Sequence, residues 1–128
     1  MSDKLIYKEE FFKIIGCCME VHNELGKGFA EIVYKDALEI EFKLKTIPYH
    51  KENEFDIYFK GYKLPRKYNA DFVVYDKIIL EAKAIESLIR HRRSHVKQTL
   101  NYLAVSKMKL GILVNFGENS LKYKRIIL

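Results

Sequence analysis

The sequence predicts an α/β fold in which helices flank a mixed central β-sheet. Three observations support this class: helical periodicity in the first third of the chain, short apolar and alternating segments in the middle, and a long helical segment followed by a buried strand. The expected order is two helices, a β-meander, a helix and two strands. The strand after the long helix is expected to lie parallel within the sheet, because such a crossover joins parallel strands.

Two helices are expected at the start of the chain. Apolar side chains recur every three or four residues along Glu9–Leu25, as in an amphipathic helix, and Gly26 suits the C-cap position. A second helix is expected from about Ala30 to Lys43. Glu31 in its first turn has a simple explanation in the helix macrodipole, worth about 0.3–1 kcal/mol.

The rest of the chain alternates strands with one helix. Side chains alternate along residues 52–59, a Lys60-Gly61 turn follows, and a short strand from Tyr62 is expected to be broken at Pro65. Four further elements complete the expected order: a hairpin over Asn69–Ala84, a helix from about Glu86 to Ser106, and strands over Leu110–Phe116 and Leu121–Ile127.

Length and composition are those of a single globular domain. The chain has 128 residues, of which 48% are hydrophobic and 31% charged, so residues 1–128 are expected to form one domain with its own core. No apolar stretch is long enough to span a membrane, no secretory signal precedes the first helix, and the adjacent Cys17 and Cys18 suggest no disulfide framework. A cytoplasmic location is therefore expected. The net charge of +6 is compatible with an anionic partner, and equally with a basic protein that binds no nucleic acid.

The Asn69–Ala84 hairpin carries the first candidate site. Its ends bear Asp71 on one strand and Glu81 and Lys83 on the other, and the strand period of two places Glu81 and Lys83 on one face. Two carboxylates about 4 Å apart repel by ~4 kcal/mol at an effective dielectric near 20. A divalent cation, a raised pKa or the Lys83 ammonium could each compensate, and hard oxygen ligands favour Mg²⁺ or Mn²⁺. The alternative is that these are solvated charges at the ends of strands.

The strand register distinguishes these alternatives. A two-residue turn at Asp76-Lys77 would place Asp71 opposite Ala82 and turn Glu81 to the other face. A three-residue loop, or one bulge, would place Asp71 opposite Glu81. An odd loop or a bulge is therefore expected if the two carboxylates form a site.

The long helix carries a second set of polar residues. A helical wheel places His91, His95, Gln98 and Tyr102 beside the apolar arc, as expected for a helix edge that faces a cleft. The two histidines at i, i+4 could bind zinc, although no third ligand is evident in the sequence and packing is the simpler role. The basic residues Arg90, Arg92, Arg93 and Lys97 either follow a phosphate backbone or form a solvated surface.

Three motifs resemble those of one enzyme superfamily. Asp71 followed by Glu81-Ala82-Lys83 resembles the signature of the PD-(D/E)XK nucleases, with Ala70 at the variable position where the name has Pro. Residues 28–34, G-x-x-E-x-x-Y, resemble the motif of the small GxxExxY family, and residues 98–102, Q-x-x-x-Y, are similar to that of RecB-type exonucleases. The resemblance extends from about residue 9 to residue 127.

The resemblance implies a restriction-endonuclease-like core of order αβββαβ and a metal-dependent active site. Glu31, Asp71, Glu81 and the backbone carbonyl of Ala82 would coordinate the metal, and Lys83 would orient or deprotonate the attacking water. Gln98 and Tyr102 would position Lys83 or a substrate phosphate. On the same basis, the expected substrate contacts are Tyr34, His95, Gln98 and Tyr102.

Three functions follow from these observations. The first is hydrolysis of phosphodiester bonds in nucleic acid, foremost DNA, with Mg²⁺ or Mn²⁺ as cofactor. The second is a nuclease fold without turnover that binds nucleic acid or a protein, and the third is a structural subunit with no nucleic-acid role. A core of this size has few ways to enclose a polymer, so a homodimer is a reasonable expectation.

Overall fold

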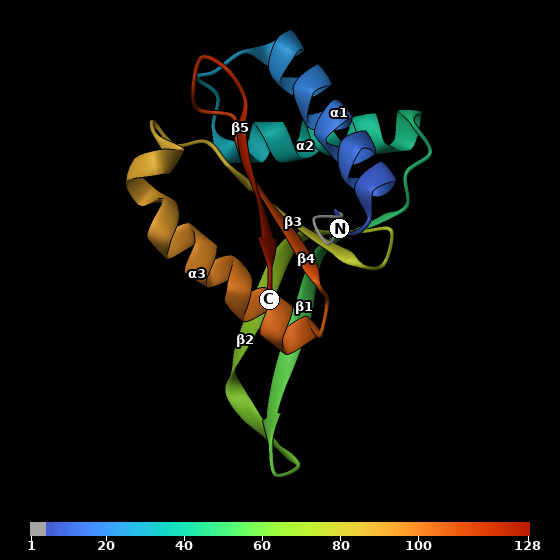
Figure 1. Ribbon diagram of the computed structural model, residues 1–128, viewed down its shortest axis with the longest axis vertical. Helices are drawn as coiled ribbons and strands as arrows, with labels where there is room; N and C mark the ends of the chain where they lie inside the picture. The colour runs from blue at the N-terminus through green and yellow to red at the C-terminus, as the bar shows by residue number, and fades with distance from the viewer. Residues whose placement is uncertain (1–4) are drawn as a thin grey trace.

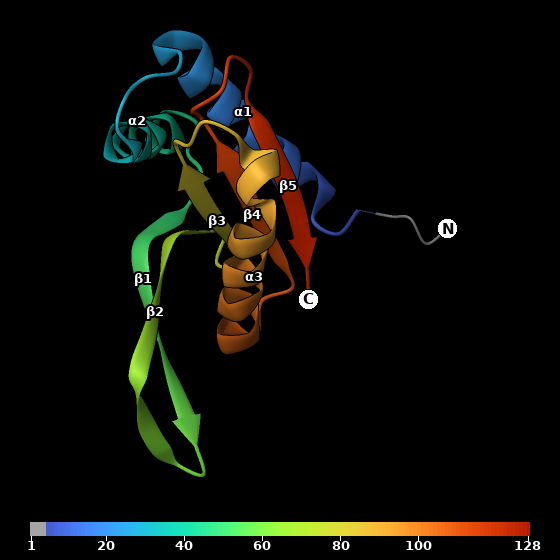
Figure 2. The same cartoon turned by 90° about the vertical axis from the view of Figure 1, so that its left-hand side faces the viewer.

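A five-stranded mixed β-sheet runs through the molecule in the order β1-β2-β3-β4-β5 (Figure 1). The structure is a computed structural model and describes residues 5–128. Two helices, α1 and α2, cover one face of the sheet and α3 covers the other (Figure 2). The predicted α/β class, a mixed sheet flanked by helices, is confirmed. Within the described residues, no helix is both long and apolar enough to cross a bilayer.

The two N-terminal helices follow the predicted periodicity. Helix α1 spans Lys8–Leu25 and α2 spans Glu31–Leu44. Gly26 closes α1 with φ 69°, and its N–H donates to the carbonyl oxygen of His22 at 2.8 Å. A glycine at this position avoids the steric cost of a left-handed conformation, so the predicted C-cap is confirmed.

Strands β1 (Tyr49–Phe59) and β2 (Tyr62–Val74) form a long hairpin that projects from the body of the molecule (Figure 2). The predicted break at Pro65 is wrong, because β2 continues through it. The reason is a register shift: Asp56 pairs with Lys67, but Tyr58 pairs with Lys63. Pro65 lies within this bulge, where no ladder N–H is required of it.

The C-terminal half forms the crossover that the sequence predicts. Strand β3 (Ile78–Lys83) leads into α3 (Leu88–Ser106), which returns the chain to β4 (Leu110–Asn115) parallel to β3. Strand β5 (Lys122–Ile127) pairs antiparallel with β4. Helix α3 begins two residues later than expected.

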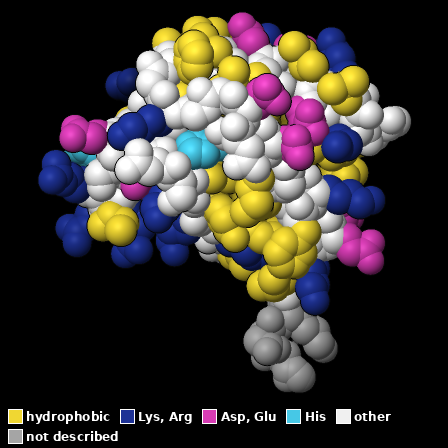
Figure 3. Space-filling model, turned by 90° about the horizontal axis from the view of Figure 1, so that it is seen from above, with side chains coloured by type: hydrophobic (Ala, Val, Ile, Leu, Met, Phe, Trp, Pro, Cys, Tyr) yellow, Lys and Arg dark blue, Asp and Glu magenta, His cyan; other side chains and the backbone are white. Residues whose placement is uncertain are grey.

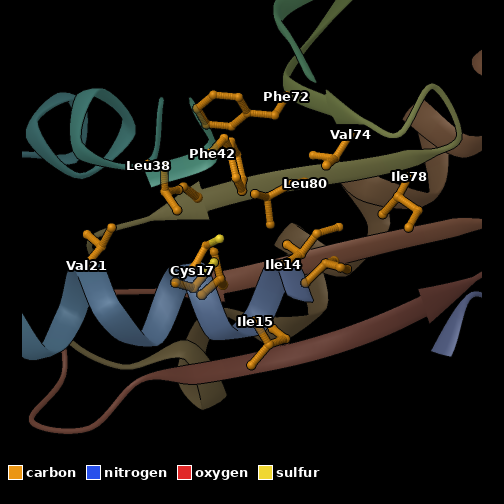
Figure 4. Close-up of a cluster of buried hydrophobic side chains, with 14 of the residues drawn as sticks. Ile14, Ile15, Cys17, Val21, Leu38, Phe42, Phe72, Val74, Ile78 and Leu80 are labelled. Atoms are coloured by element: carbon orange, nitrogen blue, oxygen red, sulfur yellow. The ribbon is translucent and has the colours of Figure 1, made fainter. Parts of the chain in front are cut away.

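Two apolar cores lie on the two faces of the sheet. The larger one joins α1 and α2 to the sheet and includes Ile14, Val21, Leu38, Phe42, Phe72 and Leu80 (Figure 4). The smaller one, beneath α3, includes Ile79, Leu103 and Leu113. Because Ile79 faces α3 and side chains alternate along a strand, Glu81 and Lys83 belong to the α3 face of β3.

Candidate active site

A three-residue loop joins β2 to β3. Val74 pairs with Ile78, which leaves Tyr75, Asp76 and Lys77 in the loop. Tyr75 and Asp76 are left-handed, with φ of 57° and 58°, and Lys77 N–H donates to the Val74 carbonyl oxygen at 3.2 Å. The odd loop predicted from the sequence is therefore present, and it sets the register that brings Asp71 and Glu81 together.

Asp71 and Glu81 interlock where β2 and β3 separate. Ladder pairing between these strands extends only from Val74–Ile78 to Phe72–Leu80. Beyond it, Asp71 N–H donates to Glu81 Oε2 at 2.8 Å, and Ala82 N–H donates to Asp71 Oδ2 at 2.9 Å. Each carboxylate therefore accepts a hydrogen bond from the backbone of the opposite strand. These two bonds hold both side chains in place.

Glu81 is a buried carboxylate with a strongly perturbed pKa. Its relative exposure is 2%. Burial, and then the negative charge of Asp71, raise the pKa of Glu81 to about 8; the Asp71 N–H and the charges of Lys83 and Lys35 oppose this only in part. The pair of carboxylates therefore attracts further positive charge.

Lys35 supplies positive charge from the first turns of α2. Its Nζ lies 2.8 Å from Asp71 Oδ1 and 3.0 Å from Glu31 Oε2. Burial lowers the pKa of the Lys35 ammonium, but its hydrogen bonds to Asp71 and Glu31 outweigh burial and raise that pKa above its ordinary value. Sequence reasoning missed Lys35. Its spacing of four residues from Glu31 on the same helix is the feature that could have identified it.

Helix α3 contributes the polar strip that the sequence predicts. Tyr102 is buried, its ring meets Tyr68 edge-on at 5.5 Å, and its hydroxyl accepts a hydrogen bond from Gln98 Nε2 at 3.4 Å. Burial, followed by the charges of Glu81 and Asp71, raises the pKa of Tyr102 to about 12. The Tyr102 hydroxyl therefore stays protonated at neutral pH and lies within the field of the carboxylate pair.

His95 and Lys83 adjoin this strip. Burial, and then the positive charge of Lys83, lower the pKa of His95, so its ring is neutral at neutral pH. Lys83 is half-buried and forms no ion pair or side-chain hydrogen bond with any other residue from 5 to 128. Its ammonium is therefore available for a ligand.

Tyr34 has a different environment from the predicted one. Its side chain is 0% exposed and stacks on Phe116 at 4.7 Å. The hydroxyl donates to the Gly26 carbonyl oxygen at 2.6 Å and accepts from Phe29 N–H at 3.3 Å. Both hydrogen-bonding directions of the Tyr34 hydroxyl are therefore used within the fold, and its contact with substrate stays a prediction. Tyr34 holds the loop between α1 and α2, which leads into Glu31.

Asn115 and Glu118 hold the start of α3, and sequence reasoning missed both. The Asn115 side chain is fully buried, and its Oδ1 accepts from Ile85 N–H at 2.9 Å. Its Nδ2 donates to the carbonyl oxygen of Ile85 at 3.0 Å and to Glu118 Oε2 at 2.7 Å. Glu118 Oε2 also accepts from Leu88 N–H at 2.9 Å. Asn115 pairs with Lys83 across the parallel ladder, so this network joins the end of the β3 site to the first turn of α3.

The donors at this site fit a hard divalent cation in part. Asp71 and Glu81 offer carboxylate oxygens, which Mg²⁺ and Mn²⁺ prefer. However, within residues 5–128 no group of three or more His, Cys, Asp or Glu side chains is gathered closely enough to hold a metal. Glu31 joins the other two carboxylates only through Lys35. The pair therefore fits a cation, and a third carboxylate can join only if the Lys35 ammonium withdraws.

The possible zinc site on α3 receives no support from the described residues. The rings of His91 and His95 lie 6.4 Å apart, centroid to centroid, in an edge-on arrangement. The part of the chain from residue 5 onward places no third ligand with them. The edge-on contact between the two rings is therefore the one interaction of these imidazoles that residues 5–128 show.

Comparisons with known proteins place the chain in one family. The family model described as the PD-(D/E)XK nuclease superfamily matches residues 8–126. The crystal structure of SSO0001 is similar with a TM-score of 0.57 and 24% identity, covering 74% of this chain and 48% of that one, so this chain spans about half its length. An alkaline exonuclease, LHK-Exo from Laribacter hongkongensis, is similar with a TM-score of 0.48 and 13% identity, covering 97% and 71% of the two chains. No curated protein matches.

Proposed function

Because the chain belongs to the PD-(D/E)XK nuclease superfamily, we propose that it is a nuclease that hydrolyses phosphodiester bonds of DNA with Mg²⁺ or Mn²⁺. The observation that carries this proposal is the interlocked pair of Asp71 and Glu81. The pair combines a buried carboxylate of raised pKa with two backbone hydrogen bonds that fix both side chains. Perturbed, preorganised carboxylates of this kind are characteristic of functional sites.

Each residue of the site has a proposed role. Asp71 and Glu81 would hold the metal with the Ala82 carbonyl and Glu31; when bound, such an ion stabilises charge on a phosphoryl oxygen and lowers the pKa of water. The free Lys83 ammonium orients the attacking water and offsets the negative charge that develops on the phosphoryl group.

Three residues of α3 would bind the phosphate beside Lys83. The Tyr102 hydroxyl, protonated at neutral pH like that of an ordinary tyrosine, donates to phosphate together with the Gln98 amide and the neutral His95 ring. The hydrogen bond between Gln98 and Tyr102 supports assigning residues 98–102 as a RecB-type Q-x-x-x-Y motif. The Tyr34 contacts that brace the loop before Glu31 support assigning residues 28–34 to the GxxExxY group.

A cleavage assay tests this function. The protein is incubated with single- and double-stranded DNA and RNA in Mg²⁺, in Mn²⁺ or in chelator, and DNA cleavage is expected only with metal. Asp71→Ala and Lys83→Ala are each expected to reduce the rate by about 10²-fold or more. Asp76→Asn, in the loop of the same hairpin, and Lys109→Met, at an exposed position before β4, are the matched controls and should retain the rate. Absence of cleavage, or full activity in the two site variants, would show that this function is wrong.

One observation favours a second candidate function, a nuclease fold that binds nucleic acid without turnover. The Lys35 ammonium already neutralises Glu31 and Asp71, so the site has a resident cation of its own. This candidate would be favoured if Mn²⁺ titration calorimetry gave no binding while salt-dependent DNA binding persisted in Glu81→Ala.

We also propose a homodimer, supported by the projecting hairpin. Its end exposes the aromatic side chains of Tyr58, Phe59 and Tyr62 at 61%, 59% and 76%. Exposed apolar groups gathered in this way are typical of interaction surfaces. Light scattering should give a dimer for the wild type and a monomer for Phe59→Asp; a monomeric wild type would contradict the proposal.

A further inference from the structure

A basic groove lies on the flank of α3 that faces β5, away from the carboxylate pair. It encloses about 810 Å³ and is lined by five cations and three apolar side chains, which are Arg90, Arg92, Arg93, Lys97, Lys124, Ile89, Val96 and Leu100. No Asp or Glu lines it. Seen from above, Lys and Arg side chains gather at the left of the molecule, where the start of α3 lies (Figure 3).

The cations of the basic groove are not neutralised within the fold. Among residues 5–128, none of the five forms an ion pair, whereas Lys side chains elsewhere on the surface pair with carboxylates. Arg93 and Lys97 are also four residues apart on one helix, a like-charge spacing that destabilises the helix by about 0.2–0.5 kcal/mol. The groove therefore concentrates uncompensated positive charge at some cost to folding.

The position of these cations on α3 adds to that cost. The first turn of α3 contains no acidic residue but contains Arg90, and Arg92 and Arg93 follow directly. The N-terminus of a helix carries partial positive charge, so cations are unfavourable there and anions are favourable. The Glu118 carboxylate already accepts from Leu88 N–H at this helix end, so a bound polyanion would act chiefly by neutralising the arginine side chains.

The dimensions of the basic groove suit a nucleic-acid strand. Seven residues separate Arg90 from Lys97, which corresponds to about 10 Å along the helix. At about 3.4 Å of helix axis per phosphate on one strand, this length matches about three phosphates. The apolar side chains Ile89, Val96 and Leu100 line the groove beside the cations and add no negative charge.

Helix α3 separates the basic groove from the carboxylate pair. His95, Gln98 and Tyr102 lie on one flank, while Arg93 and Lys97 lie on the other, and a helix with its side chains is about 10–12 Å wide. We propose that the basic groove binds the phosphate backbone of the nucleic acid away from the cleaved bond, so that α3 lies between the two parts of the substrate. This inference rests on the proposed function, which supplies nucleic acid as the polymer.

The test measures DNA binding in chelator, so that cleavage does not enter the result. Fluorescence anisotropy with a labelled duplex of about 30 base pairs is recorded between about 50 and 200 mM salt. The groove variant is Arg93→Gln/Lys97→Gln. The matched control, Lys8→Gln/Lys13→Gln, removes the same charge from α1, on the other face of the sheet. Circular dichroism checks that both variants are folded.

The groove variant should bind about tenfold or more weakly at 100 mM salt, and its log–log salt slope should fall by about 2, since each phosphate contact contributes about 0.9. The control should change affinity less than about twofold. If the groove variant bound DNA as tightly as the wild type, the inference would be overturned. It would also be overturned if the control lost as much affinity as the groove variant, because that result would show only an effect of net charge. Binding to an acidic protein such as poly-glutamate with the same variant sensitivity, and none to DNA, would also overturn it.

These outcomes are independent of those for the proposed nuclease. Groove-dependent binding without any cleavage in Mg²⁺ or Mn²⁺ would uphold the groove and reject the enzyme. Cleavage with unchanged binding in the groove variant would do the reverse.

Discussion

Lys35 places its ammonium nitrogen 2.8 Å from Oδ1 of Asp71, on the side of that carboxylate opposite the hairpin backbone contact. The same nitrogen lies 3.0 Å from Glu31. Helix α2 and strand β2 are thus joined at the site by a positive charge that lies between two carboxylates, as a bound cation would. The behaviour of Lys35 therefore distinguishes a site ready for a cation from a site that already contains its own.

Replacing Lys35 with Met should destabilise the metal-free protein and strengthen metal binding. The Lys35 and Asp71 side chains are mostly buried, at 16% and 13% exposure. Removing one partner leaves the other charge without compensation, which costs on the order of 2–4 kcal/mol. Urea unfolding in chelator measures this loss, and Mn²⁺ calorimetry is expected to show tighter binding, because the ammonium no longer competes for Asp71 and Glu31.

The matched control for Lys35 lies on the same helix. Lys43 pairs with Glu39 at 3.8 Å and is 69% exposed, so Lys43→Met should change the free energy of unfolding by less than about 0.5 kcal/mol. If Lys35→Met bound Mn²⁺ more weakly than the wild type, the Lys35 ammonium would not compete with the metal for Asp71 and Glu31. Lys35 would instead support the metal-bound state.

Glu81→Gln should stabilise the metal-free protein at neutral and alkaline pH. The pKa of Glu81 is raised to about 8 in the folded chain, chiefly by burial, against 4.5 for the ordinary group. The folded state therefore retains a proton that the unfolded state loses, and the stabilising contribution of Glu81, present below pH 4.5, is lost as pH rises through about 8. Glutamine cannot ionise, so its advantage should grow across this window to on the order of 2–4 kcal/mol.

Urea titrations of the wild type and Glu81→Gln in chelator, at several values between pH 4.5 and 8.5, measure this difference. The control is Glu9→Gln on α1, where an exposed carboxylate is replaced in the same way. If the wild type instead became steadily more stable than Glu81→Gln as the pH rises, the stability difference would have the opposite sign. That result would contradict a raised pKa of Glu81.

Asn115→Ala should destabilise the fold by about 1–3 kcal/mol, because it removes the side-chain partner of the half-buried Ile85 N–H and C=O groups. It should also slow cleavage, since Glu118 would no longer be held where it accepts from Leu88 N–H at the start of α3. Thermal unfolding and the cleavage assay measure the two effects. Asn119→Ala, an exposed neighbour in the following turn, should do neither.

Much of this architecture is predictable from local pattern. The periodicity of α1 and α2, the apolar runs of β3 and β4 and the odd loop at residues 75–77 depend on residues close together in the sequence. The late start of α3 is also local: the Ser87 side chain accepts from Arg90 N–H at 3.4 Å and caps the helix. Ser87 itself, a serine directly before the helical segment, was visible in the sequence as a possible N-cap.

Contacts between distant segments were harder to predict. Pro65 is accommodated by a register shift that depends on both strands of the hairpin. The Asn115 network joins residues 30 positions apart, and no local pattern links Asn115 to Ile85. For Lys35, the helix spacing identifies Glu31 as one neighbour, but only the packing of α2 against β2 identifies Asp71 as the other.

Tyr34→Phe tests whether the Tyr34 hydroxyl contacts substrate or only holds the fold together. The phenylalanine keeps the stacked ring beside Phe116 but loses the bonds to Gly26 and Phe29, so the protein should lose about 1–2 kcal/mol of stability. Because the hydroxyl is buried within the fold, the cleavage rate well below the melting temperature should fall less than about fivefold. Tyr102→Phe, which removes a hydroxyl from the polar strip of α3, should reduce the rate much more for a similar change in stability. A loss of about 10²-fold in folded Tyr34→Phe would instead place that hydroxyl at the substrate.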